Sequence, residues 1–265
     1  MLTAHLRNDF ETVEKNEEVR KVLGWMRGET RRRPIITDGG RPYGIPNRSA
    51  FMDSRIIDRA AVAKYTQPVP VPREDADVAE ALAAMSEAFV PYVPVRDGRD
   101  RVAGYVDALD LLRNEDGPDA GAVAMPVARL APTDTLGKAI HDFRGQHTDH
   151  LPVLDAGRLV GVLPRQALIG VETNRTVPKG SGDLASDTDH MLRDTVADLM
   201  QQGAITVAPA MPFARLVARL GETGYAFVGD EARIMGVVTP EIAVRAVRPM
   251  RTAPTGRHGG PGVPA

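Results

Sequence analysis

Three histidines, His141, His147 and His150, are the closest approach in this sequence to a metal-binding group. His147 and His150 are separated by two residues, and Asp149 could add a carboxylate oxygen to their imidazole nitrogens. The segment is, however, typical of a loop between a helix and a strand, where no helical face would fix that spacing. We therefore expect a polar loop that holds no metal but can line a ligand site.

No catalytic arrangement accompanies these histidines. Ser and Thr residues are scattered without a paired histidine, and the sequence contains no glycine-rich phosphate loop of the Walker or Rossmann type. The absence of Cys excludes disulfides, thiolate nucleophiles, iron–sulfur clusters and Cys-based zinc sites. The sequence therefore predicts a protein without enzymatic activity.

A basic cluster is the other chemically distinctive group, and it consists of Arg27, Arg31, Arg32 and Arg33. Its side chains are either solvated or able to contact an anion or a partner. The chain as a whole does not favour nucleic acid, because 33 Lys and Arg against 35 Asp and Glu give a net charge of −2 and only 5% of residues are aromatic.

Length and hydropathy are those of a globular protein. At roughly 150 residues per domain, 265 residues correspond to about two compact units, and 43% hydrophobic content is too high for a disordered chain. No apolar run approaches the ~18 residues of a membrane span, and the N-terminal sequence MLTAHLRNDFE has acids where a signal peptide would be apolar. We expect a cytoplasmic protein without a membrane segment.

One helical pattern occurs four times. Apolar residues at i, i+3, i+4 and i+7, the buried stripe of a short amphipathic helix, begin at Val19, Val78, Leu136 and Phe213. About 25 residues after each start, a glycine stands in a β-like run. These glycines are Gly44, Gly104, Gly161 and Gly236. Such a regular recurrence indicates an internal repeat.

A β-hairpin is predicted between each helix and its glycine. A short apolar strand is followed by a turn containing Asp and Gly, and a second strand carries the glycine. A further strand-like piece precedes each helix. Each repeat is therefore predicted to have the order β-α-β-β-α, with its last helix beginning just after the glycine.

Motifs inside these repeats resemble the cystathionine β-synthase (CBS) domain. TVADLM at 195–200 is similar to the entry of that domain, LPVLD at 151–155 to its hairpin, and GYVDALDL at 104–111 to its ending. The resemblance extends over four copies and nearly the whole chain. It implies an α/β (α+β) fold of four β-α-β-β-α repeats, which pair as two modules because one copy cannot bury both faces of its small sheet.

We assign copies one and two to residues 1–117 and copies three and four to residues 118–250. Residues 171–195 are an enlarged connector in the second module, and residues 251–265 are a tail rich in Pro and Gly that we expect to be disordered. Outer helices leave apolar faces that one module cannot cover. A homodimer or an internally paired flat assembly is therefore expected.

The resemblance also implies where a ligand binds. In the family, an adenosine-containing ligand lies between paired copies, a carboxylate six positions after the glycine holds the ribose hydroxyls, and a Ser or Thr three positions after it meets phosphate at a helix N-terminus. Among Ala50, Asp110, Ala167 and Ile242, only Asp110 has the carboxylate. Among Asn47, Asp107, Pro164 and Thr239, only Thr239 has the hydroxyl. No single copy has both.

Further ligand contacts are expected from position in the repeats. Arg31 and Arg32 precede the first copy's hairpin on the side of Asp110, and Asp107 would repel phosphate unless these arginines offset it, which favours weakly charged ligands. The remaining candidates are Tyr92, Tyr105, Thr12, Val237 and His150. Simpler interpretations stay open: Asp110 as an exposed helical acid, Thr239 as a helix N-cap before Pro240, and the tyrosines as packing residues.

These observations favour a non-enzymatic regulatory protein with no required cofactor. It would bind AMP, ATP, S-adenosylmethionine or methylthioadenosine and signal to a regulated protein partner by a shift in conformation. One alternative is a structural or oligomerising scaffold with decayed sites, since three copies lack the ribose carboxylate. A less favoured alternative is nucleic-acid binding through Arg31–Arg33 and the tail.

Overall fold

The computed structural model describes residues 1–22, 33–47, 50, 59–168 and 194–251. The first unit contains η1 (Leu2–His5), β1 (Phe10–Glu14), β2 (Arg33–Asp38) and β3 (Arg41–Pro46). The second contains η2 (Val62–Tyr65), β4 (Thr66–Gln67), α3 (Val78–Ala88), β5 (Tyr92–Arg96), β6 (Val102–Asp107) and α4 (Ala108–Leu112). The third contains α5 (Ala120–Val123), α6 (Leu136–Phe143), β7 (His150–Asp155) and β8 (Arg158–Pro164). The fourth contains α9 (Val196–Leu199), β9 (Thr206–Val207), α10 (Phe213–Thr223), β10 (Ala226–Gly229), β11 (Ile234–Val238) and α11 (Pro240–Arg251).

Three of the predicted amphipathic helices, α3, α6 and α10, begin at the residues that their apolar patterns indicate. The side chains of Asp77 and Thr135 cap α3 and α6 by accepting hydrogen bonds from the backbone N–H groups of Glu80 and Lys138. The apolar quartets form the buried stripes; in α10 these residues are Phe213, Leu216, Val217 and Leu220. In the first unit, Val19 and Val22 are buried, and the rest of that pattern lies outside the described residues.

The predicted hairpins are also confirmed. Antiparallel pairs join β2 to β3, β5 to β6, β7 to β8 and β10 to β11, while β1 and β9 lie parallel to β2 and β10. The described strands form small sheets of two to four strands, so the fold is mixed α/β as predicted.

The repeat glycines have a role that the sequence pattern did not reveal. In each unit, the entry segment of its paired unit crosses directly over the glycine: a Cβ on Gly104 would lie 2.7 Å from the carbonyl oxygen of Arg7, and one on Gly161 would lie 2.6 Å from that of Gln201. Gly44 and Gly236 are covered in the same way by Gln67 and Met125. The entry segments are thus exchanged between units one and two and between units three and four.

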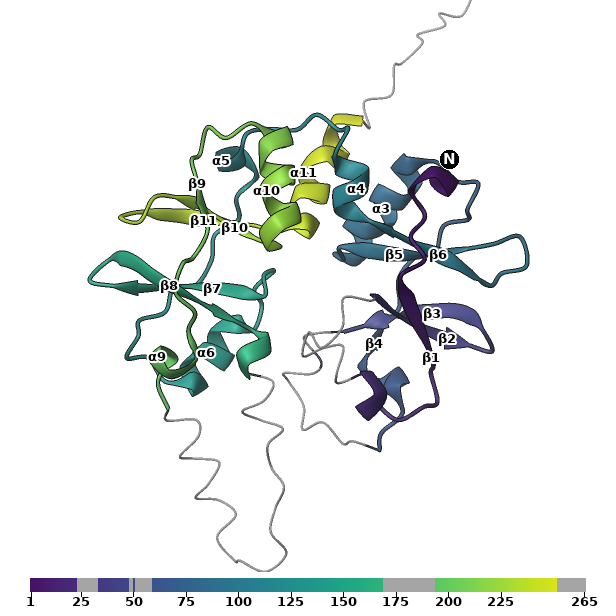
Figure 1. Cartoon of the computed structure of the whole chain (residues 1–265), viewed down its shortest axis with the longest axis horizontal. Helices are drawn as coiled ribbons and strands as arrows, with labels where there is room; N and C mark the ends of the chain where they lie inside the picture. Colours follow the sequence, from purple (N-terminus) through teal and green to yellow (C-terminus); the bar gives the residue numbers. More distant parts are fainter. Residues whose placement is uncertain (23–32, 48–49, 51–58, 169–193, 252–265) are drawn as a thin grey trace, which may run out of the picture.

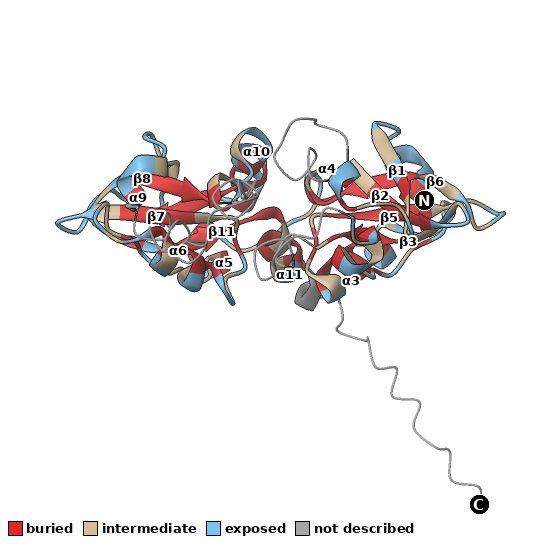
Figure 2. Ribbon diagram, turned by 90° about the horizontal axis from the view of Figure 1, so that it is seen from below, coloured by how far each residue is buried: buried red, intermediate tan, exposed pale blue. Residues whose placement is uncertain are grey.

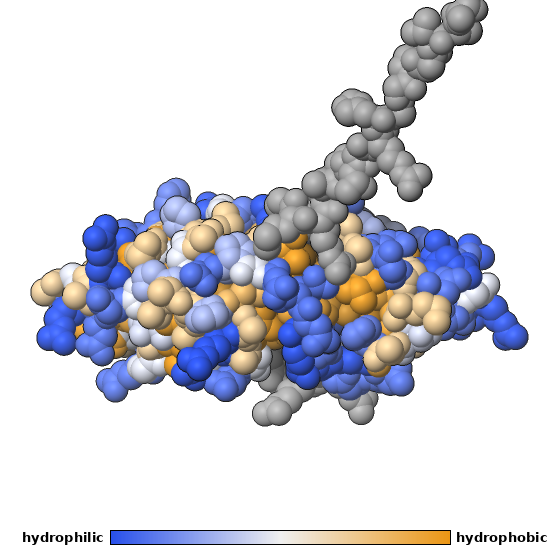
Figure 3. Space-filling view, turned by 90° about the horizontal axis from the view of Figure 1, so that it is seen from above, coloured by the Kyte–Doolittle hydropathy of each residue, from blue (hydrophilic) through white to orange (hydrophobic). Residues whose placement is uncertain are grey.

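The four units form a flat body, which Figure 1 shows from its broad face and Figure 2 from its edge. Buried residues lie along its middle layer (Figure 2), and one hydrophobic cluster joins α3 and α4 of the second unit to α10 and α11 of the fourth. Figure 3 shows the opposite edge, where hydrophilic side chains surround apolar patches. Apolar helix faces of the two modules thus cover each other within one chain.

Candidate functional site

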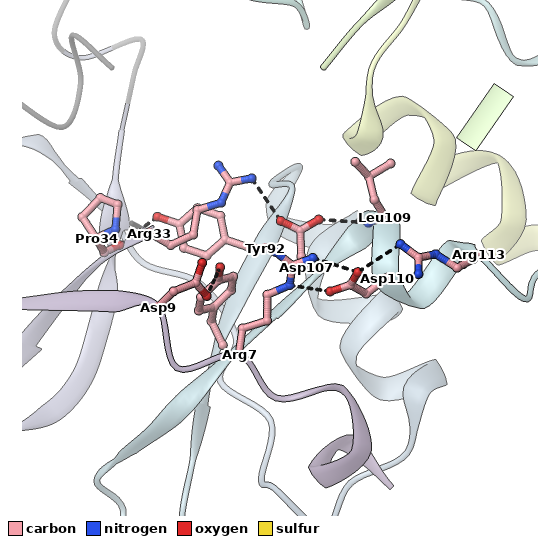
Figure 4. A network of polar contacts seen from close by, with 10 residues as sticks. Arg7, Asp9, Arg33, Pro34, Tyr92, Asp107, Leu109, Asp110 and Arg113 are labelled. Carbon is pink, nitrogen blue, oxygen red and sulfur yellow. Dashed lines mark hydrogen bonds and ion pairs between the residues drawn. The ribbon is translucent and has the colours of Figure 1, made fainter. Parts of the chain in front are cut away.

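Asp107 and Asp110, the two carboxylates expected at the ligand site, lie where β6 ends and α4 begins (Figure 4). Asp107 is the N-cap residue of α4: its Oδ1 accepts a hydrogen bond from the backbone N–H of Leu109 at 3.1 Å, and its side chain is buried. The position expected to meet a phosphate is therefore used to start a helix.

Arg33 offsets the charge of Asp107. The guanidinium Nη2 of Arg33 donates to Oδ2 of Asp107 at 3.0 Å, and its planar group lies 5.0 Å from the centre of the Tyr92 ring. Arg31 and Arg32, to which the sequence analysis gave this role, lie outside the described residues. The basic cluster thus reaches the site through Arg33, the member to which the sequence analysis assigned no ligand contact.

Asp110, in the first turn of α4, binds an arginine that the sequence analysis missed. Nε and Nη2 of Arg7 donate to the two carboxylate oxygens of Asp110 at 2.5 and 2.9 Å, in a fork-to-fork pair. Arg113 approaches one of these oxygens at 3.7 Å. The hydrogen bonds to Asp110 raise the pKa of Arg7 above its ordinary value. Nothing in the repeat pattern marks Arg7, because it lies 103 residues from its partner.

The two tyrosines of the site are buried and hydrogen-bonded. Tyr105 donates its hydroxyl to Asp9 at 2.8 Å, and Tyr92 donates to the carbonyl of Pro34 at 2.8 Å; their rings meet edge to face at 5.7 Å. Burial, followed by the bond to Asp9, raises the pKa of Tyr105 to about 12. Both tyrosines therefore connect the first unit to the second.

Thr12, also expected at this site, has an exposed position in β1 opposite Ile35 of β2. No hydrogen bond of its side chain links it to the carboxylates within the described residues.

In the second module, Thr239 immediately precedes α11 and is 4% exposed. Its backbone carbonyl accepts the N–H of Ala243, but among the described residues its Oγ1 has no hydrogen-bond partner. The side-chain cap that offered the simpler interpretation is therefore not formed. A buried hydroxyl without a partner at the start of a 12-residue helix is available to an anionic ligand.

Val237 and His150, the other candidates of this module, have structural partners. Val237 exchanges backbone hydrogen bonds with Met125, the residue that crosses over Gly236. The imidazole of His150 stacks on the Tyr225 ring at 4.0 Å, so these two residues join the third unit to the fourth.

His147, His150 and Asp149, whose spacing was compared with that of a metal site, have separate partners. The rings of His147 and His150 contact Phe89 and Tyr225, and Asp149 forms an ion pair with Arg165 at 2.9 Å. Arg165 is buried and donates to the backbone carbonyls of Phe143 and Thr148, so it holds this loop in place. In the described part of the chain, no three His, Cys, Asp or Glu side chains could share a metal ion.

Comparison with known proteins agrees with this architecture. The CBS domain family matches residues 62–117 and 120–173. A structure from Methanocaldococcus jannaschii, described as a putative archaeal homolog of g-AMPK, is 18% identical, with 92% of this chain and 98% of that chain aligned and a TM-score of 0.74. An uncharacterized conserved protein from Pyrococcus horikoshii is 17% identical, with coverages of 93% and 99% and a TM-score of 0.61. No curated protein matches in sequence.

The described helices include none that is long and apolar enough to cross a membrane.

Proposed function

We propose that this chain, which belongs to the tandem CBS-domain family, is a regulatory protein without enzymatic activity that binds an adenosine-containing ligand between its first and second units. The ligand would change the balance between two arrangements of the units, and a partner protein would respond to that balance.

The observation that carries the proposal is the polar network of Figure 4. It draws Arg7, Asp9 and Arg33 from the first unit and Tyr105, Asp107 and Asp110 from the second. A ligand that binds Asp110 therefore meets groups whose positions depend on how the two units are joined. Binding can then be converted into a change in their orientation.

The ion pair between Arg33 and Asp107 also changes the expected charge preference of the site. Both oxygens of Asp107 have partners, one a backbone N–H and the other a cationic nitrogen, so its repulsion of a phosphate is reduced. AMP therefore joins the weakly charged ligands as a candidate, together with S-adenosylmethionine and methylthioadenosine. ATP remains the least favoured, because Asp107 repels its greater negative charge more strongly than that of AMP.

The second module supports a weaker site at Thr239. Its hydroxyl could donate to a phosphate at the N-terminus of α11, but Ile242, at the ribose position, is buried in the core. The position in this unit that corresponds to Asp110 therefore has no carboxylate. We therefore propose that the first module contains the main ligand site.

Isothermal titration of the whole chain with adenosine, AMP, ATP, S-adenosylmethionine and methylthioadenosine tests the proposal. Asp110→Ala should weaken binding by about 10- to 100-fold, the loss expected when a hydrogen bond to a charged group is removed. Thr239→Val, which changes only the second module, is the matched control and should leave the main site intact. Ligand binding that is undiminished in Asp110→Ala would contradict the assignment.

A structural scaffold is the second candidate, and one observation favours it. Asp107 and Asp110 already have arginine partners, so neither carboxylate needs a ligand to neutralise it. A scaffold should show no rise in melting temperature with any of the five compounds, whereas a ligand at about 100 times its dissociation constant should stabilise the chain by about 2.7 kcal/mol.

A further inference from the structure

Arg7 occupies the carboxylate that the proposed ligand needs. Its guanidinium donates to both oxygens of Asp110, the two acceptors that the ribose hydroxyls of the proposed ligand would need, and the Asp110 side chain is only 20% exposed. A carboxylate has further lone pairs, but a fork-to-fork pair covers the edge from which a neighbouring pair of hydroxyls would approach.

The backbone holds Arg7 in this position. Arg7 and Tyr105 exchange backbone hydrogen bonds at 2.9 and 3.2 Å, and the absence of a side chain on Gly104 allows this close crossing. The preceding residues are anchored as well, since Leu2 is fully buried and its N–H donates to the carbonyl of Ala76. The long Arg7 side chain is 42% exposed, so it can turn into solvent without moving the crossing.

We propose that Arg7 is a latch on Asp110, an internal competitor that a ligand must displace in order to bind. This inference rests on the proposed function of Asp110. In the ligand-free chain, the Arg7–Asp110 pair closes the site. The apparent affinity is then the intrinsic affinity multiplied by the fraction of molecules in which this pair is open. It acts most strongly against ligands that offer the released guanidinium no anion in return, such as adenosine.

Adenosine is accordingly the probe, because it has the two ribose hydroxyls and no charge. Calorimetric titration of the whole chain should show that Arg7→Ala binds adenosine about 2- to 5-fold more tightly than the unmodified chain, the upper part of the range for loss of a partly exposed ion pair. Arg113→Ala is the matched control: Arg113 also faces Asp110, but only at 3.7 Å and from a largely exposed position. Its affinity should stay within about twofold of the unmodified chain.

The salt dependence of adenosine binding distinguishes a latch from an arginine with a purely structural role. Raising the salt from about 50 to about 300 mM screens the Arg7–Asp110 pair and should strengthen adenosine binding to the unmodified chain, but not to Arg7→Ala. If Arg7→Ala folds poorly, Arg7→Lys keeps the charge, loses the fork and should bind with intermediate affinity.

The outcomes separate the latch from the function on which it rests. Adenosine binding that is equal or weaker in both Arg7 variants overturns the latch and leaves the site assignment standing. Absence of adenosine binding in the unmodified chain and in every variant overturns the latch, and absence of binding of all five compounds overturns the site assignment as well.

Discussion

Tyr105 illustrates how individual residues serve the site and the fold together. Its ring is 1% exposed, and its hydroxyl donates to Asp9 across the boundary between the first two units. Burial and this bond raise its pKa from 10 to about 12, so the folded chain holds the phenolic proton more tightly than the unfolded chain does. The stability from this difference is complete below about pH 10 and is lost as the pH rises toward the folded-state pKa.

We therefore predict that the free energy of unfolding falls at alkaline pH through the ionisation of Tyr105. Tyr105→Phe should cost about 1 kcal/mol at neutral pH through loss of the hydrogen bond. Between about pH 10 and 12, the unmodified chain should lose about 2 kcal/mol more than the variant. Urea unfolding over this pH range measures the difference, and a difference that stays constant with pH would contradict the prediction.

At the scale of elements, the crossings over the repeat glycines decide how units pair. Gln201 exchanges backbone hydrogen bonds with Val162 at 2.9 and 2.8 Å while its carbonyl lies against Gly161. A side chain at Gly161 would meet backbone, which cannot turn aside as a flexible side chain does. In each module, the two units exchange these crossing segments, so that each unit extends the sheet of the other.

Gly161→Ala should consequently destabilise the chain by about 1–3 kcal/mol, the usual cost of overpacking. Gly221→Ala is the matched control, because that glycine lies inside α10 and a Cβ added to it would have open space around it; alanine there should add about 0.5–1 kcal/mol. Chemical denaturation measures both. Equal effects of the two substitutions would show that the crossing tolerates a methyl group.

At the scale of the whole molecule, Phe89 joins the two modules. It follows α3, and its ring lies 4.4 Å from that of His147 and 4.5 Å from the guanidinium of Arg245 on α11. The shared hydrophobic cluster continues this contact into the cores of both modules. The boundaries 1–117 and 118–250 and the homodimer remain proposals; light scattering that reports a monomer would contradict the homodimer while leaving the internal pairing intact.

Phe89→Ala should weaken the coupling between the modules. We expect a loss of about 1–3 kcal/mol and a calorimetric transition that broadens or divides in two, because the cooperativity of unfolding depends on such contacts. Met235→Ala, at a half-exposed position in β11, should change the stability by no more than about 0.5 kcal/mol. An unchanged melting curve for Phe89→Ala would place the coupling elsewhere.

The sequence by itself determined the repeat and its elements. Val78, Leu136 and Phe213 mark the starts of α3, α6 and α10 because a helix with one apolar face has a periodicity that is visible within a dozen residues. The hairpins were equally predictable, since turn residues between two apolar strands are a local signal. The resemblance of the motifs then indicated the family and singled out Asp110 as the carboxylate of the candidate site.

Only the tertiary structure decided which groups surround that carboxylate. Arg7 lies 103 residues from Asp110 in the sequence, and Arg33 lies 74 residues from Asp107. No local pattern predicts either pairing. The same holds for the glycines, whose positions the repeat predicted but whose crossing partners come from the paired unit. An ion pair or a close crossing depends on where two remote segments meet in space, and that is fixed by packing of the whole core rather than by the residues on either side.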